Sequence, residues 1–128
     1  VEEKLVDLMS RDKVVAWGEC GLDYFDKNTR GQIKNHEKRE LQRRVFARQM
    51  DLAVSLGMPL VVHTRFAEED TLELMVKHLP ENHLVHVHCF TSSASMAQEL
   101  LQSFPRLHLG FTGVVTFKNG RDVREVAR

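Results

Sequence analysis

The sequence has no long apolar run and no excess charge of either sign. No stretch approaches the roughly 20 consecutive apolar residues that a membrane span needs, and no signal-peptide pattern opens the chain. We therefore expect an intracellular protein, nuclear or cytoplasmic, without a membrane contact. Its 18 Lys and Arg residues balance 18 Asp and Glu residues. This balance excludes a global positive field that would recruit nucleic acid, so any contact with phosphate must be local.

Cysteine is scarce as well. Cys20 and Cys89 both lie in strand-like runs and lack the spacing of a disulfide framework, so we expect reduced thiols. Strand alternation predicts that both point away from the adjacent polar residues, Glu19 and His88, and act as packing residues.

Hydrophobic residues make up 42% of the 128-residue chain, which is enough for an ordinary folded core. Four apolar runs predict strands at residues 14–19, 60–63, 84–88 and 107–111. Helical spacing of apolar residues predicts helices that carry Leu5, Leu8 and Met9; Leu41, Val45, Leu52 and Leu56; Leu72, Met75, Val76 and Leu79; Met96, Ala97, Leu100, Leu101 and Phe104; and Val123, Val126 and Ala127. Residues 23–35 are expected to form a polar loop.

Strands that alternate with helices indicate an α/β fold of right-handed parallel (β/α) units, without an internal linker. A closed eight-stranded barrel takes about 250 residues, so four units would supply half of one. The chain opens without a methionine and stops inside a helical pattern, so both ends look like cuts. An open doubly wound sheet also fits this length, and the local pattern leaves the two architectures open.

Three polar residues stand where predicted strands end: Glu19, His63 and His88. Any one of them could simply be a hydrogen-bonded residue at the end of a strand. Parallel strands bring their carboxyl ends together, however, so three such residues are expected to converge at one edge. A carboxylate and two imidazoles suit a divalent ion such as Zn²⁺, Mn²⁺ or Mg²⁺. Such an ion would polarise a phosphoryl oxygen and activate a water molecule.

The strings GECGLDY, PLVVHTR, HCFTSS and GFTGVVTFKN resemble the successive strand-end motifs of the TatD family of metal-dependent nucleases, in the family's order. The resemblance covers residues 14–128, and the eukaryotic nuclear members look nearest. It implies about half of a TIM-type barrel of the metallo-dependent hydrolase kind, with residues 1–128 as one partial domain that lacks the first and last strands. It also implies cleavage of DNA, with RNA as the alternative substrate.

In the resemblance, Glu19 matches a carboxylate that bridges two divalent ions, while His63 and His88 match imidazole ligands. The family's His-x-His pair and its Asp ligand lie outside this chain. Arg65 matches an arginine that holds substrate phosphate through its bidentate fork. The alternative for Arg65 is a surface ion pair with Glu68 or Glu69.

Two departures from the family pattern affect substrate binding more than metal binding. Phe66 stands where the family usually has an acidic residue. The HCF motif continues with Thr91, Ser92 and Ser93 instead of Thr-Gly-Ser. The missing glycine removes a place where backbone can approach a phosphate closely.

Other polar residues are weaker candidates for a site. We expect His86 to be a satisfied core histidine and Asp23 to serve either as a turn residue or as a family position. Basic residues crowd the helix after residue 35, but interspersed acids favour a solvated face. The loop basic residues are more promising, because loops of about a dozen residues are uncommon unless functional. These residues are Lys27, Arg30 and Lys34.

Three functions remain open from the sequence. The first is a metal-dependent phosphodiesterase. The second keeps the metal site but acts on an amide, lactone or aminoacyl ester, because a fold does not fix a substrate. The third is an inactive half-barrel that binds a partner. An open half-barrel would leave Val15, Trp17, Val61 and His86 partly wet, and its free edges would favour self-association.

Overall fold

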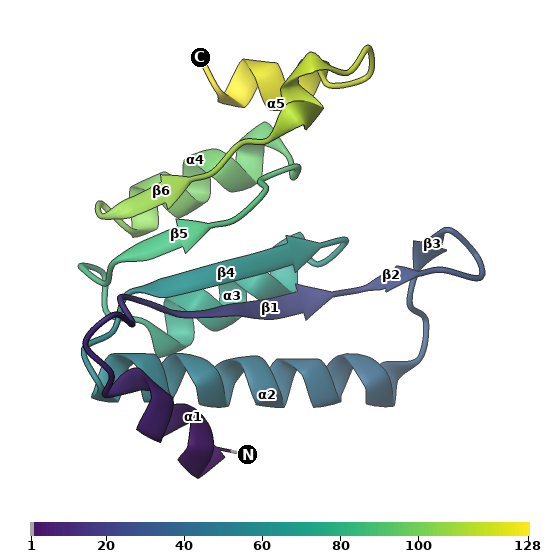
Figure 1. Ribbon diagram of the computed structural model, residues 1–128. Helices are drawn as coiled ribbons and strands as arrows, with labels where there is room; N and C mark the ends of the chain where they lie inside the picture. Colours follow the sequence, from purple (N-terminus) through teal and green to yellow (C-terminus); the bar gives the residue numbers. More distant parts are fainter. Residues whose placement is uncertain (1) are drawn as a thin grey trace.

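The computed structural model describes residues 2–128 and contains a four-stranded parallel sheet with helices on one face (Figure 1). The strand order is β1-β4-β5-β6, as predicted for consecutive (β/α) units. These strands are β1 (Trp17–Asp23), β4 (Leu60–Arg65), β5 (Val85–Val87) and β6 (Leu107–Leu109).

The helices follow the predicted pattern, and two of them begin at side-chain caps. Asn35 accepts a hydrogen bond from the Lys38 amide and Ser93 accepts one from the Met96 amide, which satisfies amide groups that a helix start leaves free. None of the helices within residues 2–128 is long and apolar enough to cross a bilayer. The helices are α1 (Glu2–Met9), α2 (His36–Ser55), α3 (Glu68–His78), α4 (Ala94–Ser103), α5 (Arg121–Val126) and the short 3₁₀ helix η1 (Gly113–Thr116).

Side-chain alternation along β4 separates a buried face of the sheet from an open one. Leu60 and Val62 are fully buried against the helical layer. Val61 and His63 point to the other face and are half-buried, as expected for Val61. Within residues 2–128 no helix covers this second face (Figure 1). Residues on the open face near the strand ends are therefore accessible to a ligand.

The predicted helix around residues 41–56 forms as α2, but the residues chosen for its core face are partly wrong. Leu41 and Val45 are 54% and 48% exposed. The helix instead buries Phe46, Met50 and Ala53. These three residues recur at positions i, i+4 and i+7, so they form one stripe that packs toward β1.

The predicted polar loop contains a small antiparallel ribbon, which is a correction to the sequence analysis. Strand β2 (Phe25–Asp26) pairs with β3 (Gly31–Gln32). The Tyr24 amide donates to the Arg65 carbonyl at 2.9 Å, which ties the ribbon to the end of β4. The ribbon therefore projects from the same end of the sheet as the candidate site (Figure 1).

The first strand starts later than predicted, and this changes the surroundings of two residues. Trp17 is only 2% exposed, and its indole donates to Gln49 at 3.1 Å. The expectation that Trp17 would be wet is therefore wrong, because it faces α2 rather than the open face. Val15 precedes the strand and is 77% exposed, as expected.

Candidate metal centre at the strand ends

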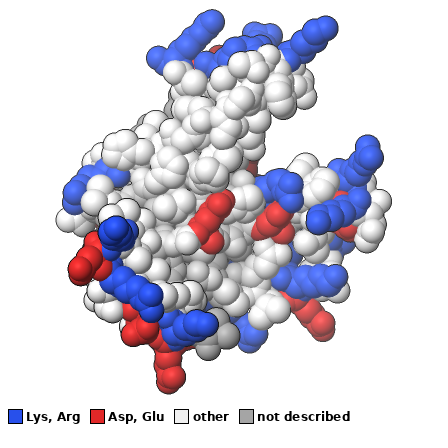
Figure 2. Space-filling model, in the orientation of Figure 1, with Lys and Arg blue, Asp and Glu red and all other residues white. Residues whose placement is uncertain are grey.

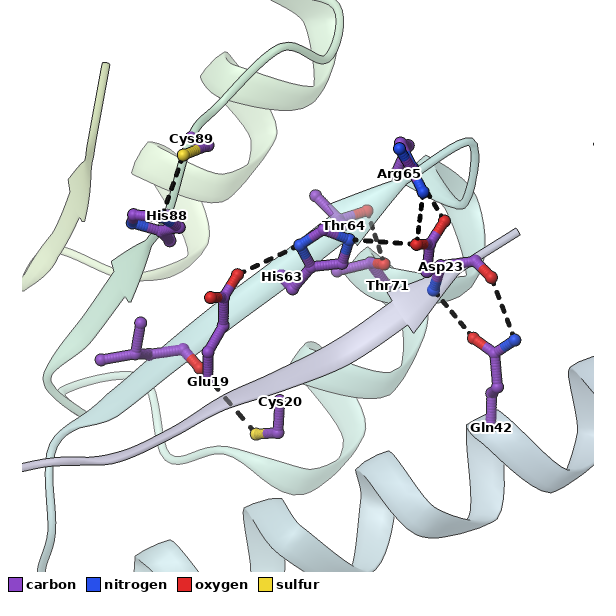
Figure 3. A network of polar contacts seen from close by, with 11 residues as sticks. Glu19, Cys20, Asp23, Gln42, His63, Thr64, Arg65, Thr71, His88 and Cys89 are labelled. Atoms are coloured by element: carbon purple, nitrogen blue, oxygen red, sulfur yellow. Dashed lines mark hydrogen bonds and ion pairs between the residues drawn. The ribbon is translucent and has the colours of Figure 1, made fainter. Parts of the chain in front are cut away.

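Glu19 and His63 meet on the open face of the sheet. Nδ1 of His63 lies 3.1 Å from Oε1 of Glu19 (Figure 3). Glu19 lies in β1 at an irregularity, since the pairing with β4 shifts between Trp17 and Cys20. Bulges of this kind re-aim side chains next to functional sites. The irregularity directs the carboxylate toward the neighbouring strand.

Close packing of β1 against β4 depends on Gly21, which pairs with His63. A Cβ atom at Gly21 would lie 1.9 Å from the His63 carbonyl oxygen, and its φ of +154° is one that side chains disfavour. The glycine in GECGLDY therefore lets the two strands approach closely enough for Glu19 to reach His63.

The second ring nitrogen of His63 has no hydrogen-bond partner among the described residues, although the atom is buried. The nearest carboxylate atom recorded for it is Oδ2 of Asp23, at 3.8 Å. When Nδ1 donates to Glu19, Nε2 carries a free lone pair, which is the form of histidine that binds metal. His63 therefore fits a divalent ion through Nε2 while Glu19 orients the ring, and Glu19 would have to turn from Nδ1 to bind the same ion.

His88 does not join this pair in the structure. Its Nε2 lies 2.9 Å from Sγ of Cys89, and its ring centroid lies 6.1 Å from that of His86. Glu19 points toward His63, while His88 turns to its own neighbour (Figure 3). Across residues 2–128, no three His, Cys, Asp or Glu side chains form a group that could hold a metal. The ligand role of His88 remains a prediction.

Cys20 and Cys89 differ, although both were expected to pack. Cys20 is buried, and this burial together with the charge of Glu19 raises its pKa to about 12. Cys89 is half-exposed and contacts the ring of His88. The expectation for Cys89 is wrong because this residue lies beyond the end of β5 with a φ of +50°, so strand alternation no longer applies.

Arg65 pairs with Asp23 and not with the acidic residues that follow it. Its Nε and one terminal nitrogen donate to the two Asp23 oxygens at 2.9 and 2.7 Å. Burial pushes the pKa of Asp23 up, but the hydrogen bonds and charge of Arg65 outweigh this effect and hold the pKa below its usual value. Asp23 thus orients the guanidinium at the mouth of the site, in addition to the turn role expected from sequence.

Two further contacts hold Asp23 and the ribbon in place. The Asp23 amide donates to the Gln42 side chain at 2.8 Å, and the Gln42 amide group returns a hydrogen bond to the Asp23 carbonyl at 3.0 Å (Figure 3). Asp23 Oδ1 also accepts from the Phe25 amide at 3.0 Å. Sequence reasoning missed Gln42, because nothing in a helix pattern marks a residue that clamps a distant strand end.

Glu68, proposed as a partner of Arg65, binds Ser93 instead. Its carboxylate accepts from the Ser93 amide at 2.9 Å and from the Ser93 hydroxyl at 2.6 Å. Ser93 also caps α4. The HCFTSS segment, which lacks the family's usual glycine, is therefore fastened to α3 by its last serine.

His86 was expected to be a core histidine. In the structure it is half-buried and lies on the open face of the sheet. It pairs in register with Val61 and His108 across the sheet. A Cβ atom at Gly110 would lie 2.6 Å from the His86 ring. Gly110 therefore makes the space that the ring occupies.

The basic residues of α2 were expected to form a solvated face, but Arg43 is largely buried in an ion-pair network. Arg43 pairs with Asp70 at 2.7 Å and with Glu73 at 3.1 Å. Arg48 pairs with Glu2. These guanidinium groups are engaged by protein carboxylates, so they are not free for nucleic acid.

Comparison with known proteins agrees with the motifs. The family model described as "TatD related DNase" matches residues 1–128. The human 3'-5' RNA nuclease TATDN2 is 42% identical over 99% of this chain and 16% of that protein. The metal-dependent hydrolase YabD of Bacillus subtilis is 36% identical over 95% of this chain and 44% of that protein. The 3'-5' ssDNA/RNA exonuclease TatD of Escherichia fergusonii is 32% identical over 98% and 45%.

Structural similarity leads to the same family. The crystal structure of the TatD homologue YJJV from Escherichia coli superposes with a TM-score of 0.78 at 27% identity, covering 97% of this chain and 44% of that one. An amidohydrolase from Saccharomyces cerevisiae, at 23% identity and a TM-score of 0.65, shares the fold. The chain spans less than half the length of the curated relatives named here. It belongs to the TatD family of metal-dependent hydrolases.

Proposed function

We propose that this chain supplies half of the active site of a metal-dependent phosphodiesterase that cleaves single-stranded DNA or RNA. The observation that carries the proposal is the His63 ring, whose Nδ1 is held by Glu19 while its Nε2 is left without a hydrogen bond among the described residues. The nuclease names of the human and Escherichia fergusonii relatives support the substrate class.

We further propose that residues 1–128 are one part of a TIM-type barrel whose remaining strands cover the open face. The relatives that match at 44% and 45% of their length support this arrangement. A complete site would hold two divalent ions, with Mg²⁺, Mn²⁺ and Zn²⁺ as candidates. Glu19, His63 and His88 are the proposed ligands from this part, and a nuclear or cytoplasmic location is proposed for the whole protein.

A bound divalent ion would supply Lewis-acid polarisation of the phosphoryl oxygen and a lowered pKa for an attacking water. The residues of this chain prepare the site for that chemistry. Glu19 fixes the tautomer and direction of His63. His88 would have to turn from Cys89 to join the pair.

Arg65 would position the substrate phosphate. Asp23 occupies two donors of its guanidinium, which holds the group rigidly at the mouth of the site. The other terminal nitrogen has no hydrogen-bond partner among the described residues and remains available to a phosphate oxygen. A guanidinium held in place loses little entropy when it binds.

The proposal can be tested by cleavage of labelled single-stranded DNA and RNA with each of the three ions and with a chelator. Both the 128-residue chain and a complete barrel that contains it should be assayed. We expect the complete barrel to cleave only with metal and to lose cleavage in His63→Ala. His78→Ala, at the C-terminal end of α3, is the matched control and should stay active. Cleavage that persists with chelator, or in His63→Ala, contradicts the proposal.

A further inference from the structure

An aromatic side chain stands exposed at the mouth of the site. Phe66 directly follows Arg65 and is 51% exposed. Its backbone has a φ of +58°, which is uncommon for a bulky residue. The Gln32 side chain donates to its carbonyl at 2.5 Å. The β2–β3 ribbon thus holds the backbone of an exposed phenylalanine, where burial would have been the ordinary outcome for the ring.

The Phe66 ring is part of a stack. It lies on Phe25 with the ring centroids 5.9 Å apart and the planes 23° from parallel. The guanidinium carbon of Arg65 lies 4.4 Å from the centroid of the same Phe25 ring. Stacking on Phe25 restrains the plane of the exposed Phe66 ring, and the Arg65 guanidinium in turn holds the Phe25 ring.

A cavity of about 530 Å³ adjoins this ring. Beside Phe66, its walls include the Gln32 amide, the Arg39 guanidinium and the acidic first turn of α3, which carries Glu68, Glu69 and Asp70. The three carboxylates of that turn outnumber the single guanidinium of Arg39 in the wall, so the cavity repels a phosphate. A neutral heterocycle meets no such repulsion and can lie against the aromatic ring.

Positive charge gathers on the ribbon and on the residues next to it in the chain. Residues 24–35 contain three basic residues and one acidic residue, which gives a net charge of 3 − 1 = +2. Lys27, Arg30 and Lys34 are exposed. In the part of the chain that the structure describes, none of the three forms a salt bridge. Figure 2 shows this basic group at the right-hand edge of the molecule. It offers a local track for phosphates on a protein whose overall charge is zero.

We propose that Phe66, backed by Phe25, is a stacking platform for one unpaired nucleobase of a single-stranded nucleic acid. The base would enter the adjoining cavity while the flanking phosphates follow the basic ribbon. This inference rests on the proposed function and adds the subsite that selects unpaired strands. A base inside a duplex already has both faces stacked, so it is not available to the ring.

The test is equilibrium binding of fluorescent oligonucleotides to the 128-residue chain in the presence of chelator, so that metal and cleavage play no part. The probes are a single-stranded DNA, the RNA of the same sequence, the DNA duplex, and a strand of the same length that lacks bases. Phe66→Ala should weaken binding of the DNA or RNA single strand by about tenfold, within the range for one stacked base. Binding of the base-free strand should not change.

Three further variants separate stacking from folding. Phe66→Leu keeps apolar bulk without a ring and should lose the same affinity, whereas Phe66→Trp should retain it and show quenched fluorescence on binding. Phe117→Ala removes another exposed ring, 56% exposed, and should bind normally. Equal binding by Phe66→Leu and the unmodified chain, no discrimination between normal and base-free strands, or no binding by any variant overturns the platform.

Cleavage by the complete barrel is measured separately on the same single strands. If cleavage fails while Phe66-dependent binding is present, the proposed function is wrong and the platform stands. If cleavage occurs and Phe66→Leu has the same KM as the unmodified barrel, the platform is wrong and the proposed function stands.

Discussion

Nδ1 of His63 lies 3.1 Å from Oε1 of Glu19, although 44 residues separate the two in the chain. The contact crosses from β4 to β1, so it exists only when the parallel sheet has formed. It also decides which nitrogen of the imidazole is free. A carboxylate that accepts from Nδ1 leaves Nε2 as the electron-pair donor, and a metal ligand needs that form.

Glu19→Gln should therefore weaken metal binding and cleavage together in a complete barrel that contains this segment. The glutamine amide keeps the size of the side chain but removes its negative charge. It can also present its NH₂ group to Nδ1, whereas an ionised carboxylate can only accept a hydrogen bond. We expect a loss of at least tenfold in metal affinity, by analogy with other groups that orient ligands. Titration calorimetry measures the affinity, and circular dichroism should show an unchanged fold. Full metal affinity in Glu19→Gln would exclude the carboxylate from the site.

Arg65→Lys should raise KM more than it lowers kcat in the complete barrel. Lysine keeps the positive charge but lacks the two guanidinium donors that bind Asp23 and the third nitrogen that would bind phosphate. Asp23→Asn should have a similar but smaller effect, because it loosens the guanidinium without removing it. Arg121→Lys, at the start of α5, is the control. If Arg65→Lys and the unmodified enzyme have equal kinetics, Arg65 does not bind substrate and has only a structural role.

Sequence pattern predicts the parallel sheet and its order because alternation of apolar runs with helical spacing is a local signal. It also singles out Glu19 and His63 at the ends of the predicted strands, although β1 and β4 continue to Asp23 and Arg65 in the structure. It does not predict the partner of Arg65. The sequence offers Glu68 or Glu69 as the partner, whereas the parallel register of β1 and β4 sets Asp23 beside Arg65. The sequence pattern does not predict the orientation of His88 either, because β5 ends at Val87 and Cys89, with a φ of +50°, leaves strand geometry.

The two cysteines should react at very different rates with a thiol reagent. Cys20 is 6% exposed and its pKa is raised to about 12, by burial and by the charge of Glu19. At pH 8 it is almost entirely protonated and enclosed, so it should react only on unfolding. Cys89 is half-exposed and should react in the native chain. Ellman's reagent should thus report one fast thiol, which disappears in Cys89→Ser. A fast thiol that survives in Cys89→Ser would contradict the burial of Cys20.

Stability should fall in acid partly through Asp70. This carboxylate accepts from the Tyr24 hydroxyl at 2.6 Å and pairs with Arg43 at 2.7 Å. Burial raises the pKa of Asp70, but these two partners lower it by more, so the pKa lies below its usual value. A depressed carboxyl pKa stabilises the fold above the unfolded value and loses this contribution as pH falls through the folded one.

Asp70→Asn should accordingly be less stable than the unmodified chain at pH 7, and the difference should shrink below a pH of about 4. Urea unfolding at a series of pH values measures it. The asparagine variant of Asp12, an exposed residue before β1, is the control and should show no such convergence. A difference that stays constant from pH 7 to pH 3 would mean that Asp70 acts through packing and not through its charge.

Gly21→Ala should be far more damaging than Gly57→Ala, although both glycines have a positive φ. Gly57 has a φ of +64° and nothing within 4 Å of its missing Cβ, so alanine there adds only backbone strain of about 1 kcal/mol. At Gly21 the new Cβ would lie 1.9 Å from the His63 carbonyl oxygen. That atom belongs to the backbone of β4 and cannot rotate away, so β1 and β4 must separate. Strain and overpacking together should cost about 3 kcal/mol or more.

Because Glu19 precedes Gly21 by two residues, the separation of β1 from β4 in Gly21→Ala should also break the contact of Glu19 with His63. Metal binding should then weaken at a temperature where the chain remains folded. Urea unfolding and metal titration of the two variants, side by side, measure both effects. Equal stability of the two would mean that the strands tolerate a wider spacing, and metal binding by a folded Gly21→Ala at full affinity would show that the Glu19–His63 contact is not needed to form the site.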